Sequence, residues 1–178
     1  MTDQPIDLKI GSIAPDFSLP SNLGREIKLS DFKSQANVVL FFVREYNWIQ
    51  CRSHAAQLGR LYPDFKSKNV EILVILGDSP EKAAQYAQIL HLSFPVLADP
   101  ERSVYHRYGL DKVLLFIQRT ASLVIDQKGI IRYIKSTANT LTWLEENREL
   151  MGFVQTISNN GWDQKFSVTN QKWLVSIK

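Results

Sequence analysis

Residues 38–76 read VVLFFVREYNWIQCRSHAAQLGRLYPDFKSKNVEILVIL, and this stretch decides the fold class. Residues 38–43 are all apolar and rich in β-branched and aromatic side chains, which predicts a strand covered on both faces. Residues 72–76 predict a second such strand. Between the two strands, from about residue 51 to 68, the apolar residues follow a helical spacing, at Ala55, Leu58, Leu61, Tyr62 and Phe65. Buried strands separated by a helix predict an α/β layer fold.

The flanking segments continue this alternation. Ser79 and Pro80 form a typical helix start, with a capping hydroxyl followed by proline at the first helical position. Further elements are expected in chain order: a strand at 94–97, a helix from Pro100 to Gly109, a hairpin with strands at 123–125 and 130–134, and a helix at 139–154. The late hairpin makes the sheet mixed rather than wholly parallel. The sequence therefore predicts a central mixed β-sheet flanked by helices and preceded by an N-terminal extended or hairpin segment.

Length and composition favour a single domain. The chain has 178 residues, of which 44% are hydrophobic, and we expect one domain over residues 1–157. Residues 158–178 are predicted to be an extension packed on the body or on a partner subunit, because they are rich in large apolar side chains, Trp162, Phe166, Trp173 and Leu174. The longest apolar run, 38–43, falls far short of the about 20 residues of a membrane-spanning helix. The N-terminus predicts no secretory signal.

Charge and cysteine content narrow the function classes. A net charge of +3, from 21 basic and 18 acidic residues, indicates neither a nucleic-acid partner nor a membrane surface. The sequence contains a single cysteine, Cys51, so it predicts no intramolecular disulfide, no metal site and no cofactor, and it favours a cytoplasmic location. Cys51 falls where the first strand gives way to a helix. In the first helical turn its thiolate would gain from backbone N–H groups and the helix dipole, while Arg44 and Arg52 add positive charge.

Several segments resemble one known family. They are GSIAPDFSL at 11–19, Gly24 followed by LSDF at 29–32, VLADP at 96–100 with YGL at 108–110, and LVIDQKGIIR at 123–132. In this collinear order they resemble the peroxiredoxins of the AhpC/TSA family over roughly residues 9–153. The resemblance implies a thioredoxin-like fold and places Cys51 in the position of the nucleophilic cysteine.

The cysteine segment departs from the usual family pattern. Peroxiredoxins have proline seven residues before the reactive cysteine and threonine or serine three before it, and here those positions are Arg44 and Trp48. A divergent peroxiredoxin-like branch instead has arginine, an aromatic residue and then Cys-x-x-Cys-Arg. Arg44, Tyr46, Cys51 and Arg52 fit that branch, but its first cysteine is Trp48 here. Dithiol exchange within one subunit is therefore not available.

The family also implies a second arginine at the start of the strand that ends in Ile-Asp. In this sequence that position is Thr120, and Arg119 comes one residue early, which in a strand points a side chain to the opposite face. Arg119 is a catalytic candidate, with a solvated strand-end arginine as the alternative. His54, three residues after Cys51, is a candidate base, although a packing role is the commoner one for a helix histidine.

We therefore predict a thiol-dependent oxidoreductase. Cys51 would reduce a peroxide or similar electrophile, an external thiol would reduce Cys51, and Arg119 would assist. Arg44, Tyr46, Trp48 and Arg52 would line the substrate pocket. A homodimer joined through Cys51 remains open. Two alternatives also stand: a thioredoxin-fold binding or assembly module whose chemistry has lapsed, and a redox sensor in which oxidation of Cys51 changes packing.

Overall fold

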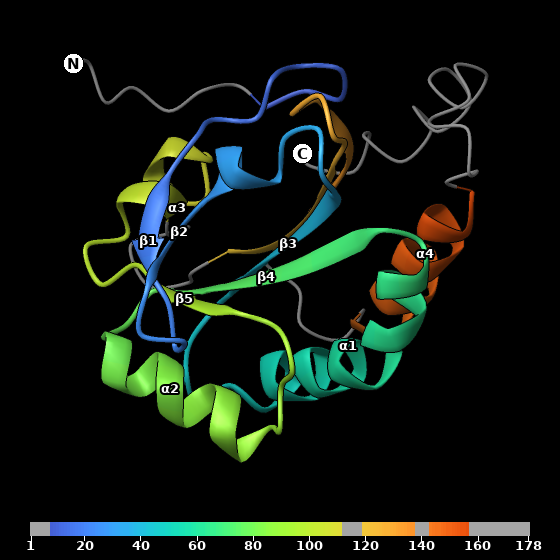
Figure 1. Cartoon of the computed structure of the whole chain (residues 1–178). Coiled ribbons are helices and arrows are strands. Elements are labelled where there is room, and N and C mark those ends of the chain that lie inside the picture. Colours follow the sequence, from blue (N-terminus) through green and yellow to red (C-terminus); the bar gives the residue numbers. More distant parts are fainter. Residues whose placement is uncertain (1–7, 112–118, 138–142, 157–178) are drawn as a thin grey trace.

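A five-stranded mixed sheet forms the centre of the molecule (Figure 1). The computed structural model describes residues 8–111, 119–137 and 143–156. Within them the strand order is β5-β4-β3-β6-β7. The first three, β3 (Asn37–Val43), β4 (Val70–Leu76) and β5 (Val96–Ala98), are parallel to one another. The last two, β6 (Thr120–Ile125) and β7 (Ile131–Thr137), form the expected hairpin, and β6 runs antiparallel to β3.

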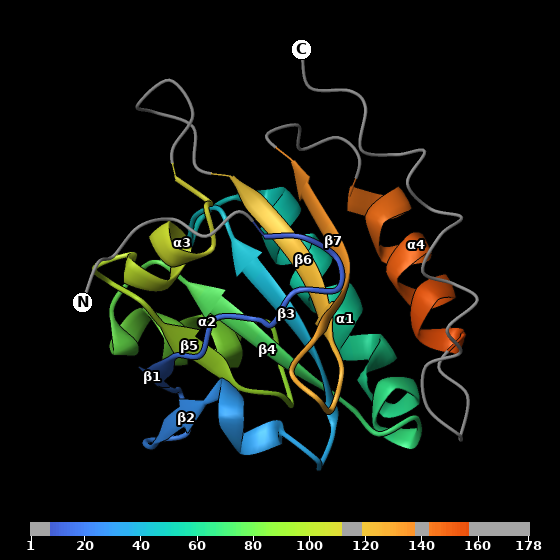
Figure 2. The ribbon, with the colours of Figure 1, turned by 90° about the horizontal axis from the view of Figure 1, so that it is seen from above.

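Helices cover both faces of this sheet (Figures 1 and 2). One face carries α1 (Ile49–Ser67), α2 (Pro80–Ile89) and α4 (Trp143–Gln155). The other carries α3 (Ser103–Arg107) together with the N-terminal segment. That segment contains the short antiparallel pair β1 (Ser18–Pro20) and β2 (Glu26–Lys28), followed by the 3-10 helix η1 (Leu29–Phe32). The prediction of an α/β fold with an N-terminal hairpin is confirmed.

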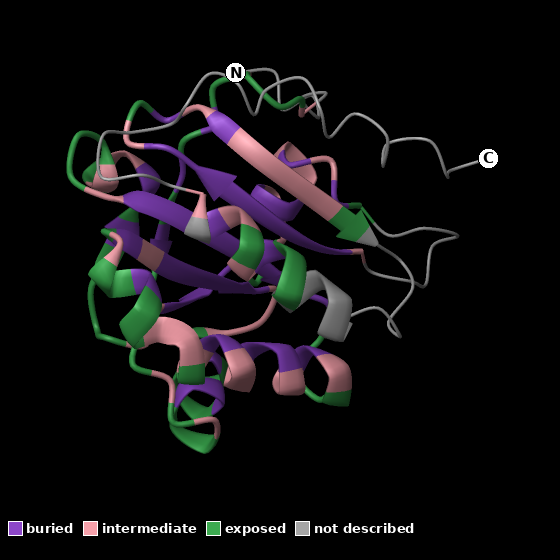
Figure 3. Cartoon of the chain, turned by 90° about the vertical axis from the view of Figure 1, so that its right-hand side faces the viewer, coloured by how far each residue is buried: buried purple, intermediate pink, exposed green. Residues whose placement is uncertain are grey.

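Strand β3 separates two hydrophobic clusters. Every residue of β3 is buried, and the central strands of the sheet are in the buried colour in Figure 3. Alternate side chains of a strand point to opposite faces of the sheet. Val39, Phe41 and Val43 pack with α1, α2 and α4. Val38, Leu40 and Phe42 pack with α3 and the N-terminal segment. Cys51 belongs to the first cluster. The face on which a side chain lies therefore determines whether it can reach the thiol.

Several predicted boundaries differ from the structure: β4 and β6 begin earlier than expected, β7 ends later, α1 begins two residues earlier, and β5 and α3 begin later. The strand expected at 94–97 is Val96–Ala98, because Pro95 has no amide proton to donate to the ladder. The helix expected from Pro100 begins at Ser103 instead. Arg102 precedes it in the left-handed conformation, with φ of 53°, which a helix cannot include.

Some expectations fall on residues that the structure does not describe. The C-terminal extension at residues 158–178 and the first part of the last predicted helix, 139–142, lie outside the described residues. The division of the chain at residue 157 therefore stays a prediction. None of the helices described combines the length and the apolar character needed to cross a membrane.

Candidate active site

Cys51 is the third residue of α1, the helix that follows the loop after β3. The helix begins after Trp48, its N-cap residue, and its first turn contains no acidic side chain. Amides in a first turn have no acceptor within the helix, so they and the helix dipole favour a negative charge there. The Cys51 side chain belongs to the core, with 4% of its surface exposed. The expected first-turn position is therefore confirmed, in a buried setting.

Arg44 and Trp48 stack on each other at the two ends of this loop. Arg44 follows the last residue of β3 and is buried, and its Cζ lies 5.3 Å from the centroid of the Trp48 ring. Trp48 is 37% exposed, whereas Arg44 is 7% exposed. At this distance the ring face attracts the cation. The two residues that replace the family's proline and threonine therefore act as one packed pair.

Tyr86 of α2 belongs to the same hydrophobic cluster as Cys51. Its side chain is 1% exposed, and its ring centroid lies 5.9 Å from that of Tyr46 in the loop. Burial raises the pKa of the Tyr86 hydroxyl, and the negative charge of Cys51 raises this pKa further, while the Arg52 guanidinium lowers it. The hydroxyl is thus electrostatically coupled to both Cys51 and Arg52. Sequence reasoning missed Tyr86 because its spacing marks it only as a core position of a helix.

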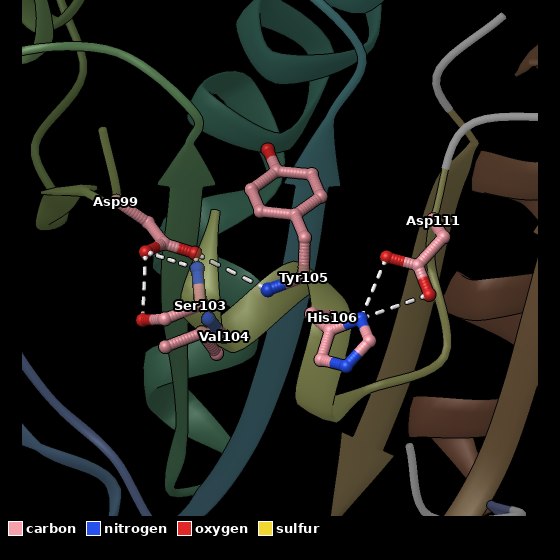
Figure 4. A network of polar contacts seen from close by, with 6 residues as sticks. All are labelled: Asp99, Ser103, Val104, Tyr105, His106 and Asp111. Atoms are coloured by element: carbon pink, nitrogen blue, oxygen red, sulfur yellow. Dashed lines mark hydrogen bonds and ion pairs between the residues drawn. The ribbon is translucent and has the colours of Figure 1, made fainter. Parts of the chain in front are cut away.

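Tyr105 of α3 joins the ends of two strands beside the site. Its hydroxyl lies 2.5 Å from the Val43 carbonyl oxygen and 2.7 Å from that of Ile75, so one proton is shared between two acceptors. The Asp99 carboxylate holds α3 in place by accepting from the amides of Ser103, Val104 and Tyr105 (Figure 4). This network fixes the end of β3 directly before Arg44.

A polar hollow of about 180 Å³ opens beside the loop. It lies at the carboxyl ends of β3 and β4, where open α/β sheets commonly bind ligands. The lining residues come from three segments: Glu45, Tyr46, Asn47, Gly77, Asp78, Lys82 and Arg102. Of the four residues predicted to line a substrate pocket, only Tyr46 is among them. The Arg102 guanidinium fills the space above Gly77, where a Cβ would come within 2.6 Å of its Cζ.

His54 packs in the core on the Cys51 side of the sheet. Its ring is stacked on Phe41, with ring centroids 4.1 Å apart, and 2% of the residue is exposed. Burial lowers the pKa of His54 to about 3. The imidazole is therefore neutral near pH 7 and a weak base. Packing, rather than proton transfer, is the role that this environment favours.

Arg119 lies immediately before β6 and is half-buried. Along β6, Val124 faces the cluster of Cys51, while Ala121 and Leu123 face the other cluster. Alternation thus puts the position of Thr120, rather than that of Arg119, on the Cys51 side. A catalytic role for Arg119 stays a prediction. Among the residues described, no group of three or more His, Cys, Asp or Glu side chains is arranged to hold a metal ion.

These features define a class: an α/β protein with one thiol in the first turn of the helix that follows its central strand. The model of the AhpC/TSA family matches residues 10–134. Peroxiredoxin Bcp of Escherichia coli is 31% identical over 153 residues, which cover 79% of this chain and 97% of that protein. The chain belongs to the AhpC/TSA family and is peroxiredoxin-like.

Solved structures agree with this assignment at the level of the fold. Peroxidoxin BcpB from Mycobacterium tuberculosis superposes with a TM-score of 0.74 at 23% identity, covering 85% of this chain and 99% of that one. The yeast mitochondrial 1-Cys peroxiredoxin gives 0.68 at 22% identity, covering 84% and 78%. The thioredoxin-like fold implied by the sequence is confirmed.

Proposed function

We propose that this protein is a single-cysteine thiol peroxidase in which Cys51 is the nucleophile. The observation that carries the proposal is the position of Cys51 in the first turn of α1, in a chain of the AhpC/TSA family. The helix dipole and the nearby Arg52 guanidinium both favour the thiolate, which is the reactive form.

The reaction follows from thiolate chemistry. The Cys51 sulfur attacks the terminal oxygen of a hydroperoxide, so an S–O bond forms and the O–O bond breaks. The sulfur is oxidised to a sulfenic acid, and the leaving alkoxide takes a proton from solvent to become an alcohol. An external thiol then condenses with the sulfenic acid, releasing water, and a second external thiol cleaves the mixed disulfide to restore Cys51.

An external reductant is needed because the sequence offers no second cysteine. The yeast 1-Cys peroxiredoxin to which this fold is similar is resolved via glutathione/thioredoxin systems. A Cys51–Cys51 disulfide between two copies requires both sulfurs to be exposed at one interface, and Cys51 is 4% exposed. We therefore favour an external thiol over a covalent homodimer. A reducing compartment such as the cytoplasm suits this cycle.

The proposal is tested by peroxide consumption with an added thiol. We expect turnover in the native protein, a sulfenic acid on Cys51 after one equivalent of peroxide, and loss of both in Cys51→Ser. The matched control is Ser53→Ala, which changes a neighbouring residue of the same helix and leaves the thiol intact. Peroxide turnover that survives in Cys51→Ser would refute the proposal.

One observation favours a second candidate. Trp48 occupies the position of the family's threonine, and its indole can donate a hydrogen bond but not accept one. A protein that had lost peroxide activation in this way could act as a binding module or as a redox sensor. Absence of a sulfenic acid after peroxide treatment would indicate the binding module. A sulfenic acid that forms without turnover would indicate the sensor.

A further inference from the structure

The polar hollow at the carboxyl ends of β3 and β4 is lined by charged side chains that the proposed reaction does not use. Its volume is about 180 Å³, and open α/β sheets commonly bind ligands at this edge. Because one water occupies about 30 Å³ in the liquid, the hollow has room for several waters or for a small molecule. The charged residues of its lining are Glu45, Asp78, Lys82 and Arg102. The pairing of these charges decides what the hollow can bind.

Lys82 and Asp78 neutralise each other. The Lys82 Nζ lies 2.9 Å from Oδ2 of Asp78, and Oδ1 of the same carboxylate accepts from the Ser79 amide at 2.9 Å. The ammonium group also lies 5.9 Å from the centroid of the Tyr46 ring. Of the two cations that line the hollow, Lys82 therefore already has a counter-ion within the protein.

Arg102 is the cation that lacks such a partner. Its Nη1 atom is buried and has no hydrogen-bond acceptor within the described part of the chain. The carboxylate of Asp99 is occupied, because its two oxygens accept from amides in the first turn of α3. A buried guanidinium nitrogen without an acceptor is costly, since it has lost its hydrogen bonds to water. Such an exception calls for an explanation, and binding of a ligand is one.

The Arg102 guanidinium is held by an aromatic ring and by the backbone rather than by acceptors. Its Cζ lies 5.1 Å from the centroid of the Tyr105 ring, and Tyr105 is buried and bonded to the ends of β3 and β4. The guanidinium also lies above Gly77, where a Cβ would come within 2.6 Å of its Cζ. A planar group that is positioned in this way loses little freedom when it binds an anion.

The surrounding charges favour a carboxylate over a phosphate. The N–H groups of a guanidinium form a planar fork that matches the two oxygens of a carboxylate. A single negative charge on the ligand balances Arg102. A more highly charged phosphate would be repelled by the carboxylates of Glu45 and Asp78 in the same lining. The ligand that fits best is therefore a small organic acid.

We propose that this hollow is a binding site for a small organic carboxylate, which the Arg102 guanidinium binds. The inference goes beyond the proposed peroxidase function and does not rest on it, because the site forms or breaks no covalent bond. Gly77 contributes by leaving the space in which the guanidinium lies. Residues 45–47, which lead from β3 towards α1, form one wall of the site.

The test is a titration of the full-length native protein with sodium propionate, followed through the NMR shifts of the backbone amides of Tyr46 and Gly77. We expect saturable shifts at these amides. The affinity should fall at least about tenfold in Arg102→Gln, because hydrogen bonds between charged groups are lost. Inorganic phosphate at the same ionic strength should bind more weakly than propionate.

A second variant and a matched control keep the test independent of folding defects. Gly77→Ala retains every charge and displaces only the tip of Arg102, so propionate should bind several-fold more weakly to a folded protein. Arg60→Gln alters an exposed arginine of α1 outside the hollow and should keep the native affinity. The inference is overturned if the native protein shows no saturable shift, if Arg102→Gln and Arg60→Gln bind equally well, or if phosphate binds more tightly than propionate. None of these results bears on Cys51-dependent peroxide turnover, which is measured separately.

Discussion

The two ends of β3 differ in how completely the buried polar groups around them are hydrogen-bonded. At its N-terminal end, the turn between β6 and β7 is fully bonded around Asp126, which is 4% exposed. Its carboxylate accepts from the amides of Lys128 and Ile130 and from Arg132, at 2.8 to 2.9 Å. On the side of the C-terminal end, polar atoms of Tyr86 and Arg102 are buried without a partner in the described residues.

This difference in hydrogen bonding suggests that one end contributes mainly to stability, while the unpartnered groups at the other end have another role. A buried polar group is usually hydrogen-bonded, and an exception calls for an explanation such as a role in catalysis or binding. The turn at Asp126 closes the hairpin, and none of its residues is such an exception within the described part of the chain. The Cys51 end keeps donors available. We therefore expect substitutions of the bonded groups at either end to change the free energy of unfolding, and substitutions of the unpartnered groups at the second end to change it little.

The largest expected effect is at the hairpin end. Asp126→Ala removes a carboxylate that three donors share and leaves Arg132 without its ion partner, so the free energy of unfolding should fall by about 3 kcal/mol. Urea unfolding measures this loss, and Cys51 alkylation should keep its native rate under folding conditions. Asp31→Ala, which removes an exposed carboxylate bonded to the Lys28 amide, is the control and should have a much smaller effect. Equal losses in the two variants would contradict the comparison.

Acidification should act through the Cys51 end. The folded-state pKa of His54 is about 3 and its ordinary value is 6.5, so below pH 6.5 the unfolded chain binds a proton that the folded chain excludes. The contribution of neutral His54 to the free energy of unfolding is fully present above pH 6.5 and is lost as the pH falls towards 3. At pH 5 the loss is about 2 kcal/mol.

The measurement is the difference in unfolding free energy between pH 7 and pH 5. His54→Phe should reduce that difference, and taking the difference within each variant cancels any constant change in stability. His91→Asn, which alters an exposed histidine, should keep the native difference. If His54→Phe behaves like His91→Asn, His54 is not the group responsible.

Tyr105→Phe tests the junction between the strand ends and the Cys51 loop. Without the hydroxyl, the carbonyls of Val43 and Ile75 lose a shared donor, and the free energy of unfolding should fall by about 1 to 2 kcal/mol. Because this bond ends β3 directly before Arg44, Cys51 oxidation by peroxide should slow as well. A loss of stability with an unchanged oxidation rate would show that the loop is positioned independently of Tyr105.

The smallest effect compares one glycine at each end. Gly129, in the turn after Asp126, has φ of +79°, so alanine there is strained and should cost about 1 to 2 kcal/mol. At Gly77 an added Cβ meets only the tip of the Arg102 side chain. That tip can move, and its Nη1 gives up no hydrogen bond within the described residues, so Gly77→Ala should cost less than about 1 kcal/mol. Urea unfolding measures the loss of unfolding free energy in both variants. A larger loss in Gly77→Ala than in Gly129→Ala would contradict the comparison of the two ends.

Local patterns were enough to predict much of this molecule. The apolar run at 38–43 predicted the central strand, because a strand covered on both faces needs apolar side chains on both. Ser79 predicted the start of α2, and its hydroxyl accepts from the Lys82 amide at 3.4 Å. The first-turn position of Cys51 followed from the change in apolar spacing after the strand. Each of these features depends on residues that are close together in the sequence.

The boundary at α3 could not be predicted in the same way. Pro100 is a good first helical residue, but the helix starts at Ser103 because the buried Asp99 carboxylate accepts from the amides of Ser103 and Val104. That arrangement requires Arg102 to turn into the left-handed region, which its residue type does not favour. The sequence contains Asp99, but it does not show from which backbone amides the Asp99 carboxylate accepts hydrogen bonds.

The sequence by itself determined the fold class, the family and the position of the single thiol, since these depend on periodicity and on short motifs. Tertiary structure alone decided which groups surround that thiol. Tyr86 is 35 positions after Cys51 in the sequence, and only the placement of α2 on the same face of the sheet as α1 brings the two residues into one hydrophobic cluster. Arg102 likewise lies above Gly77 because two strand ends and α3 meet there. Spacing predicts which face of an element is buried, but not which side chain of another element it will meet.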